Sequence, residues 1–143
     1  MDSLKTEKKL LKRASENVIL LDELIEFLII ESNHSPEFLE VKEKFKLVKL
    51  ALSAISITEF TSFYFIKFKK SIMERRVEKL LNYDYTKFIE KNIESDTDKL
   101  IRALIELIKN IWKRNNESVN FKIENFILKF LQISLRFNKY LKK

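Results

Sequence analysis

The sequence predicts an all-α fold, a compact bundle of five to six helices, from three observations. Its 143 residues include no glycine and one proline, and hairpin turns, phosphate-binding loops and Rossmann motifs depend heavily on glycine. Apolar residues recur at spacings of three and four, which is the period of one face of an α-helix. An apolar content of 45% is enough for one core, so we expect a single domain over residues 1–143.

The first predicted helix covers residues 3–31, with an apolar face of Leu11, Ala14, Val18, Leu21, Ile25 and Leu28. A polar break at 32–35 follows, in which the Ser35 hydroxyl is expected to accept a hydrogen bond from a first-turn amide of the next helix. Pro36 suits the first position of that second helix, because proline has no amide hydrogen to satisfy there. Its apolar face is Phe38, Val41, Phe45, Val48, Leu52 and Ile55.

A third helix is predicted from about residue 57 to residue 81, because Ser56 and Glu59 have the S-x-x-E spacing of a capping box. It contains the stretch SFYFIKFKK (62–70), in which aromatic residues and lysines alternate. Four apolar residues of this region share a helical spacing and are expected in the core: Phe60, Phe63, Phe68 and Ile72. The lysines of the same stretch are expected on the surface.

Two more long helices are predicted in the second half of the chain. Residues 83–92 should form a short helix or an irregular connector, and acids at 96 and 98 favour the first turn of the helix that follows. The buried face of that helix is predicted to be Ile101, Leu104, Ile108 and Ile111. After the polar residues 115–118, the last helix carries Ile123, Phe126, Phe130, Ile133, Phe137 and Tyr140 on one face.

Composition limits the compartment and the chemistry. The absence of cysteine excludes disulfides, thiolate nucleophiles and zinc-thiolate sites, and favours the cytoplasm. Residues 1–13 are charged throughout and no apolar run reaches the length of a membrane span, so no membrane association is expected. The abundance of lysine, glutamate and isoleucine resembles the composition of proteins from hyperthermophiles.

Charge is distributed unevenly along the chain. Residues 16–40 contain seven acids and neither lysine nor arginine, so this segment carries −7 and the net charge of +7 leaves +14 for the remainder. Basic residues gather in the predicted third helix, and from Lys109 onward nine basic residues oppose only Glu117 and Glu124. We therefore expect a molecule with one acidic and one basic side.

No residue pattern indicates catalysis, a metal or a cofactor. His34 lies between Glu31 and Glu37, but three ligands in different local geometries are more typical of solvated loop residues than of a metal site. Asp22 and Glu26 share a helix face, and a solvated acidic face explains them better than a magnesium site. No serine or threonine stands near a usable base, so we expect no enzyme activity.

The basic residues instead predict a binding surface for RNA or another single-stranded nucleic acid. Lysine and arginine on one face neutralise phosphates and release counterions, although the same residues also serve merely to keep a surface soluble. The residues predicted to contact phosphates are Lys67, Lys69, Lys70, Arg75, Arg76, Lys113, Arg114, Arg136 and Lys139. Tyr64, Tyr83, Tyr85 and Trp112 are the aromatic residues that are available to stack on unpaired bases.

The acidic segment predicts contact with other proteins, including further subunits of a complex. Its predicted partner-binding residues are Asp22, Glu23, Glu26, Glu37 and Glu40. Complementarity between the −7 segment and the +14 remainder also favours head-to-tail contact between copies of the chain, which produces rods or filaments if the contact does not close.

Two stretches resemble the helical small subunit of type III-A CRISPR effector complexes, and the similarity in layout covers nearly the whole chain. ISITEFTSFY (55–64) matches a family motif at Ser56, Thr58, Phe63 and Tyr64. Glu59 stands where the family has glutamine, and Thr61 replaces its arginine, so no role of that arginine carries over. FILKFLQISLRFNKY (126–140) resembles the closing motif of the family at Phe130, Ile133, Lys139 and Tyr140.

This resemblance implies a non-catalytic helical bundle, copies of which stack head to tail along a guide RNA and its target. A second resemblance, of ERRVEKLL (74–81) and residues 92–111, is to the α-helical domain of the GINS accessory subunits of replicative helicases. The small β domain of most such subunits has no counterpart, because residues 115–143 are predicted to be helical. A viral or regulatory helical protein that binds a partner through its acidic face is a third alternative.

Overall fold

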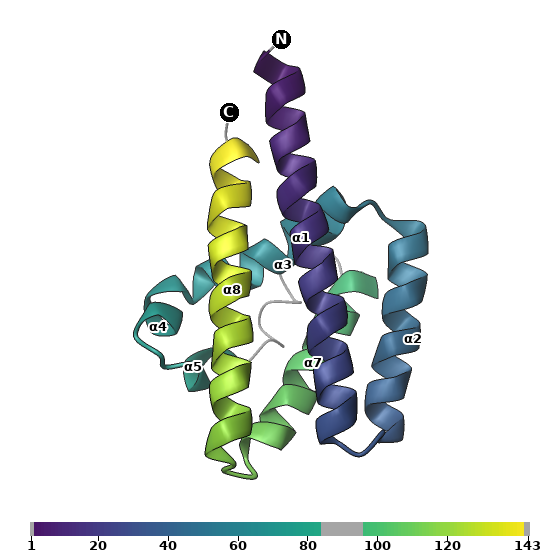
Figure 1. Cartoon of the computed structure of the whole chain (residues 1–143), viewed down its shortest axis with the longest axis vertical. Helices are drawn as coiled ribbons and strands as arrows, with labels where there is room; N and C mark the ends of the chain where they lie inside the picture. The colour runs from purple at the N-terminus through teal and green to yellow at the C-terminus, as the bar shows by residue number, and fades with distance from the viewer. Residues whose placement is uncertain (1, 84–95, 142–143) are drawn as a thin grey trace.

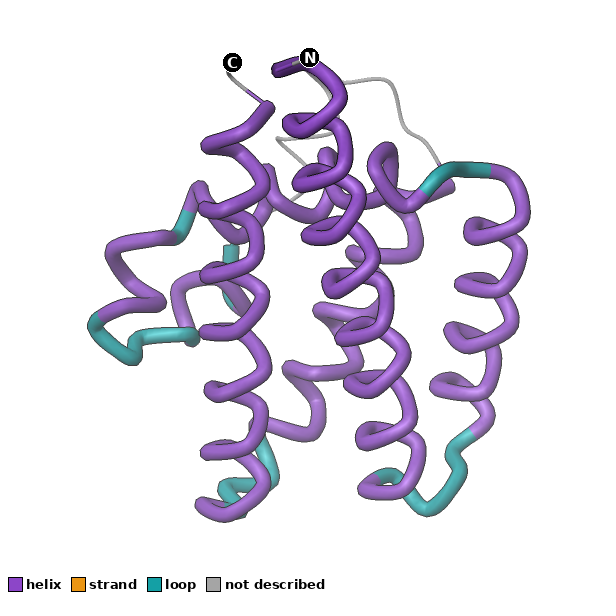
Figure 2. Tube along the Cα trace, turned by 45° about the horizontal axis from the view of Figure 1, so that its top comes forward, coloured by secondary structure: helices purple, strands orange, loops and turns teal. Residues whose placement is uncertain are grey.

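The computed structural model describes residues 2–83 and 96–141, and Figure 1 shows that these residues are almost entirely helical. Within these ranges the helices are α1 (Asp2–Glu31), α2 (Pro36–Ala51), α3 (Ala54–Lys67), α4 (Lys69–Met73), α5 (Glu78–Leu81), α7 (Asp96–Trp112) and α8 (Glu117–Leu141). The described residues include no strand, as Figure 2 also shows. The all-α prediction is confirmed, whereas the predicted number of five to six helices is too low, since the described ranges alone contain seven.

The two longest helices, α1 and α8, run antiparallel side by side, and α3 crosses behind them (Figure 1). These three helices pack against one another, while α2 packs against α1 and α7. Most of the described buried apolar side chains form one cluster that includes residues of all seven helices, among them Leu28, Phe45, Phe130 and Ile123. Phe65 of α3 stacks on Phe130 of α8, with 4.9 Å between the ring centroids.

The boundary between α1 and α2 lies where the sequence predicts it, but the predicted cap is wrong. Pro36 occupies the first turn of α2, as expected. The Ser35 side chain makes no cap hydrogen bond, because its hydroxyl donates to the Glu37 carboxylate instead. At the other end α2 stops at Ala51, since Leu52 is extended with φ −126° and ψ 149°. Ile55 therefore belongs to α3 and not to α2.

The predicted helix over residues 57–81 is also wrong, because the chain forms three shorter helices there. The N-cap is Ser53, whose hydroxyl accepts a hydrogen bond from the Ser56 amide at 3.1 Å. The chain leaves helical geometry at Phe68, with φ −107° and ψ 22°, and again over residues 74–77. The predicted start near residue 57 is therefore three residues late, because Ser53 and not Ser56 caps α3.

The buried face of α3 is partly polar, which corrects the predicted core. Phe60 and Phe63 are 36% and 54% exposed, while Thr58, Thr61 and Ser62 are buried. The small side chains of α3 suit close packing against α1 and α8, and this packing turns the two phenylalanines outward. Ile72 is buried as predicted, and Phe68 is half-buried with its ring edge-on to Tyr83. On α1, the predicted core residue Leu11 is 52% exposed.

Asn17 of α1 joins this polar face through two hydrogen bonds. Its Nδ2 donates to Thr58 Oγ1 at 3.1 Å and to Thr61 Oγ1 at 3.0 Å, and all three residues are buried. The threonine hydroxyls donate in turn to backbone carbonyls of α3, Thr58 to Ala54 at 2.8 Å and Thr61 to Thr58 at 3.3 Å. The Asn17 Nδ2 and both threonine hydroxyls are therefore paired, whereas Asn17 Oδ1 and Ser62 Oγ are buried without a hydrogen-bond partner among the described residues.

Helix ends use left-handed residues other than glycine. Asn33, His34, Arg75 and Asn115 have φ between 56° and 60°. After α1, the His34 amide donates to the Ile29 carbonyl at 2.8 Å, and after α4 the Arg76 amide donates to the Ser71 carbonyl at 2.7 Å. These six-to-one hydrogen bonds are typical of Schellman termini, in which glycine is the usual left-handed residue.

We predict that Ser53→Ala lowers the free energy of unfolding by about 1 kcal/mol, because the first turn of α3 loses its cap. Ser56→Ala, at the position that the capping-box pattern indicated, should change it by less than about 0.5 kcal/mol. Urea denaturation followed by circular dichroism measures both values. Equal losses in the two variants, or a larger loss in Ser56→Ala, would contradict the assignment of Ser53 as the cap.

We also predict that Asn17→Ala destabilises the chain by about 2 kcal/mol, since two buried hydrogen bonds are lost and a small cavity remains. The matched control is Asn110→Ala, at an exposed position of α7, which should change stability by less than about 0.5 kcal/mol. The same urea titration compares them. A loss for Asn17→Ala as small as that of the control would show that the polar contact does not hold α3 in place.

Candidate nucleic-acid interface

The nine basic residues predicted to bind phosphates lie in three separate places. Lys67, Lys69, Lys70, Arg75 and Arg76 belong to the corner formed by the end of α3, α4 and the turn before α5. Lys113 and Arg114 lie in the turn between α7 and α8, and Arg136 and Lys139 lie near the end of α8. The second and third places are at opposite ends of α8. The 22 residue steps from the start of α8 to Lys139 correspond to about 33 Å along the helix axis. No single surface therefore combines all nine.

Contacts within the chain occupy several cations of the α3–α5 corner. Lys67 Nζ lies 2.8 Å from the Tyr83 hydroxyl and 4.4 Å from the centroid of its ring. Arg75 pairs with Glu124 of α8 at 3.2 Å and lies 5.6 Å from the ring of Phe121. These contacts attach the corner to neighbouring segments, and the ion pair with Glu124 offsets the charge of Arg75.

The aromatic residues that were expected to stack on bases are mostly not displayed for that purpose. Tyr64 is 2% exposed, so its predicted role as a stacking surface is wrong. Tyr83 and Trp112 are half-buried and pack against the core. Tyr85 lies outside the described residues.

A basic face on the first half of α1 was missed by the sequence analysis. Lys5, Lys8, Lys9 and Lys12 lie within about 100° of one another around the helix axis, given 3.6 residues per turn. The signal is present in the stretch LKTEKKLLKR (4–13), which we considered only as evidence against a membrane segment. Helical spacing applied to its lysines would have revealed the face.

The fold brings this face next to the end of α8. The beginning of α1 and the end of α8 extend together beyond the other described helices (Figure 1). Lys9 Nζ lies 5.0 Å from the ring centroid of Tyr140, which fixes the contact between the two helices. We call the resulting group the terminal basic cluster, and its members are Lys5, Lys8, Lys9, Lys12, Arg136 and Lys139.

Few acids accompany the terminal basic cluster. Residues 4–15 of α1 contain one acid, Glu7, and α8 contains none after Glu124. The next acid of α1, Glu16, forms an ion pair with Arg13 at 3.0 Å. All six members of the cluster are exposed. The cluster is therefore a surface of positive potential made by two helices.

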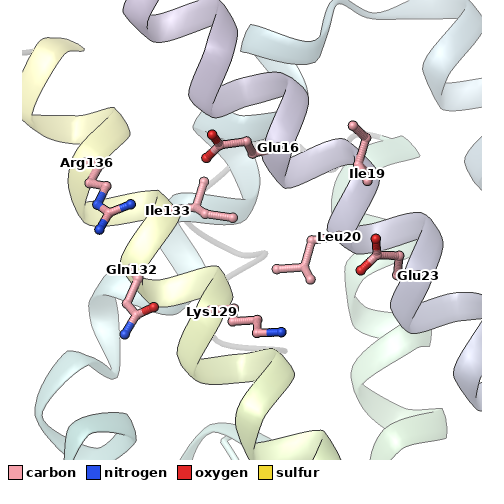
Figure 3. Close-up of a pocket in the computed structure, with 8 residues that line it drawn as sticks. All are labelled: Glu16, Ile19, Leu20, Glu23, Lys129, Gln132, Ile133 and Arg136. Carbon is pink, nitrogen blue, oxygen red and sulfur yellow. The ribbon is translucent and has the colours of Figure 1, made fainter.

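A shallow groove of about 300 Å³ continues from the cluster along the α1–α8 seam. Figure 3 shows its walls, which are Glu16, Ile19, Leu20 and Glu23 from α1 and Lys129, Gln132, Ile133 and Arg136 from α8. The α8 wall is basic and the α1 wall is acidic, so the charges of the two walls offset each other. Arg136 belongs to both the groove and the terminal basic cluster, so the positive charge beyond the groove comes from the α1 lysines and Lys139.

Most of the predicted partner-binding acids make contacts within the chain. Asp22 pairs with Lys49 at 2.9 Å and Glu26 pairs with Lys42 at 2.6 Å, and both ion pairs join α1 to α2. The hydrogen bond with Glu26 raises the pKa of Lys42 above its ordinary value. The remaining predicted acids are placed as follows: Glu40 pairs with Lys44 at 3.3 Å, Glu37 accepts from Ser35, and Glu23 is exposed at the groove.

The described residues contain no group of three His, Cys, Asp or Glu side chains that is close enough to hold a metal ion. His34 is an exposed turn residue with φ 60°. Over the same part of the chain, no helix combines the length and the apolar character that a membrane span requires.

Comparisons of the chain with protein-family models, with curated proteins and with solved structures give no match. The resemblances to the CRISPR small subunit and to the GINS subunits therefore stay predictions.

We predict that Ser35→Ala raises the pKa of the Glu37 carboxyl, which the hydrogen bond from Ser35 holds below 4.5. Because the pKa is lowered in the folded chain, the contribution of this bond to stability is present above pH 4.5 and is lost as the pH falls through the lowered pKa. A carboxyl-carbon NMR titration measures the change. An unaltered Glu37 pKa in Ser35→Ala, with Ser56→Ala as control, would contradict the contact.

Proposed function

We propose that this chain is a non-catalytic helical subunit that binds the phosphate backbone of single-stranded RNA or DNA at its terminal basic cluster. The observation that carries the proposal is the convergence of four lysines of α1 with Arg136 and Lys139 of α8 on one exposed end. Cations gathered from two helices gain affinity by releasing counterions from the phosphates that they neutralise. Three features support this assignment, and the first two favour the terminal cluster over the other basic sites.

The first feature is charge balance. The terminal cluster has six exposed cations, of which Arg136 borders the acidic wall of the groove, and Glu7 is the one acid of residues 4–15; the α3–α5 corner contains Glu74 and Glu78 and faces Glu124. At the corner, Arg75 pairs with Glu124 at 3.2 Å and Arg76 lies 3.8 Å from Glu74. Positive potential is therefore less compensated at the terminal end of the molecule.

The second feature is the length and width of the basic surface. The lysine face of α1 from Lys5 to Lys12 extends about 10 Å along the helix, and the end of α8 lies beside it as a second row. Two rows of cations surround a flexible nucleic-acid backbone better than a single row does.

The third feature is residue type, because lysine acts as a mobile point charge and favours binding that does not depend on base sequence.

Membership of a larger complex is the part of the proposal that rests on the two resemblances. A ribonucleoprotein of the type III CRISPR kind is the first form, with head-to-tail contact between copies, and a replicative helicase assembly is the alternative. Co-purification with a guide RNA supports the first form, and co-purification with a helicase supports the second.

We predict that Lys5→Gln/Lys8→Gln/Lys12→Gln weakens binding to a single-stranded oligonucleotide by at least about tenfold at about 50 mM salt. The slope of log K against log salt should become shallower by about 2, since three phosphate contacts are lost at about 0.7 each. Fluorescence anisotropy over a salt series measures both quantities. The matched control is Lys69→Gln/Lys70→Gln/Lys79→Gln, which removes the same charge at the α3–α5 corner.

Two outcomes would contradict the proposal in different ways. Absence of binding by the unaltered chain at about 50 mM salt would reject the nucleic-acid function itself. If the α1 variant binds as the unaltered chain does and the control binds more weakly, the chain binds nucleic acid, but at the α3–α5 corner and not at the terminal basic cluster. Normal circular dichroism spectra of both variants would show that the fold is intact.

A further inference from the structure

Helix α2 has two opposite apolar faces, of which the bundle uses one. Its inner face, formed by Phe38, Val41, Phe45 and Val48, is buried against α1 and α7. Its outer face exposes three leucines, with Leu39 at 42%, Leu47 at 66% and Leu50 at 85%. In both views α2 is at the edge of the molecule, with no described helix outside it (Figures 1 and 2). The outer leucines are therefore without a partner within the described part of the chain.

The outer face also has an ordered pattern of charge. Leu39, Glu43, Lys46 and Leu50 follow one another at spacings of four, three and four, which is the seam of a short coiled coil. When these four positions are followed in the opposite chain direction, leucines again occupy both ends, and Lys46 then comes before Glu43. Glu43 and Lys46 are exposed and pair with each other at 3.1 Å on the helix surface. Both groups are thus at the surface and able to pair across an interface.

We propose that the outer face of α2 binds the same face of a second copy of this chain, with the two helices antiparallel. This arrangement puts Leu39 opposite Leu50 of the second copy and Glu43 opposite Lys46 of the second copy, and the two-fold axis repeats both contacts. A parallel arrangement would instead put Glu43 opposite Glu43 of the second copy, which charge repulsion disfavours. The charge pattern therefore selects both the partner and its direction.

The contact should be weak and should depend on concentration. One pair of short helices buries less than the roughly 1,200 Å² that is typical of stable protein complexes. This two-fold contact differs from the head-to-tail contact considered above and uses no residue of the terminal basic cluster. Each dimer would carry two copies of that cluster, so it is compatible with the proposed nucleic-acid function without depending on it.

Charge reversal on α2 tests the arrangement by sedimentation velocity over a concentration series. Glu43→Lys and Lys46→Glu should each weaken self-association at least fivefold, because like charges then face each other at two places. The double variant Glu43→Lys/Lys46→Glu should restore it, since opposite charges again meet. Lys44→Glu is the matched control, because Lys44 lies on the same helix outside the outer face and should leave self-association unchanged.

A cysteine experiment tests the register, and the natural chain has no cysteine to interfere. Leu39→Cys and Leu50→Cys should form a disulfide-linked dimer under mild oxidation when the two variants are mixed, and much less when each is alone. A monomeric natural chain at all concentrations, a double charge variant that stays monomeric, or equal crosslinking of single and mixed variants would each overturn the proposal. Either of the first two results would show that the outer face of α2 does not bind a second copy of the chain, and that it binds another partner or none.

Discussion

The hydrogen bonds between Asn17 and two threonines of α3 are the contact on which the arrangement of the bundle depends. They bring a polar face of α3 against α1, in a position where an apolar face would be the ordinary choice. Once Thr58 and Thr61 point inward, Phe60 and Phe63 must point outward. A buried polar contact of this kind favours one rotation of a helix over others, because any other rotation leaves the polar groups without partners.

The distribution of charge has a structural and a functional component. Two acids in the second half of α1, Asp22 and Glu26, form ion pairs with lysines of α2 and so join the two helices. The lysines of the first half of α1 have no such ion pairs among the described residues, and this part of the helix lies beside the basic end of α8. The same helix is therefore a scaffold element at one end and an exposed cationic surface at the other.

Periodicity predicted the long helices well and the middle of the chain poorly. The faces of α7 and α8 follow from spacing alone, since Ile101 and Ile123 are buried as expected. The division of residues 54–81 into three helices could not be predicted, because local spacing does not contain the contacts with α1 and α8 that decide which face of α3 is buried. For the candidate site, the sequence indicated basic character and included Arg136 and Lys139 among nine predicted phosphate contacts. It could not show that the end of α8 lies beside the beginning of α1.

The lack of glycine at the helix ends has a consequence for the unfolded chain. Glycine samples more backbone conformations than any other residue, so a chain without it has a narrower unfolded ensemble and loses less conformational entropy when it folds. The opposing effect is local strain at Arg75 and at the three other residues that adopt left-handed geometry in place of glycine. The absence of glycine thus favours folding by reducing the conformational entropy of the unfolded chain, at the cost of backbone strain at these four described residues.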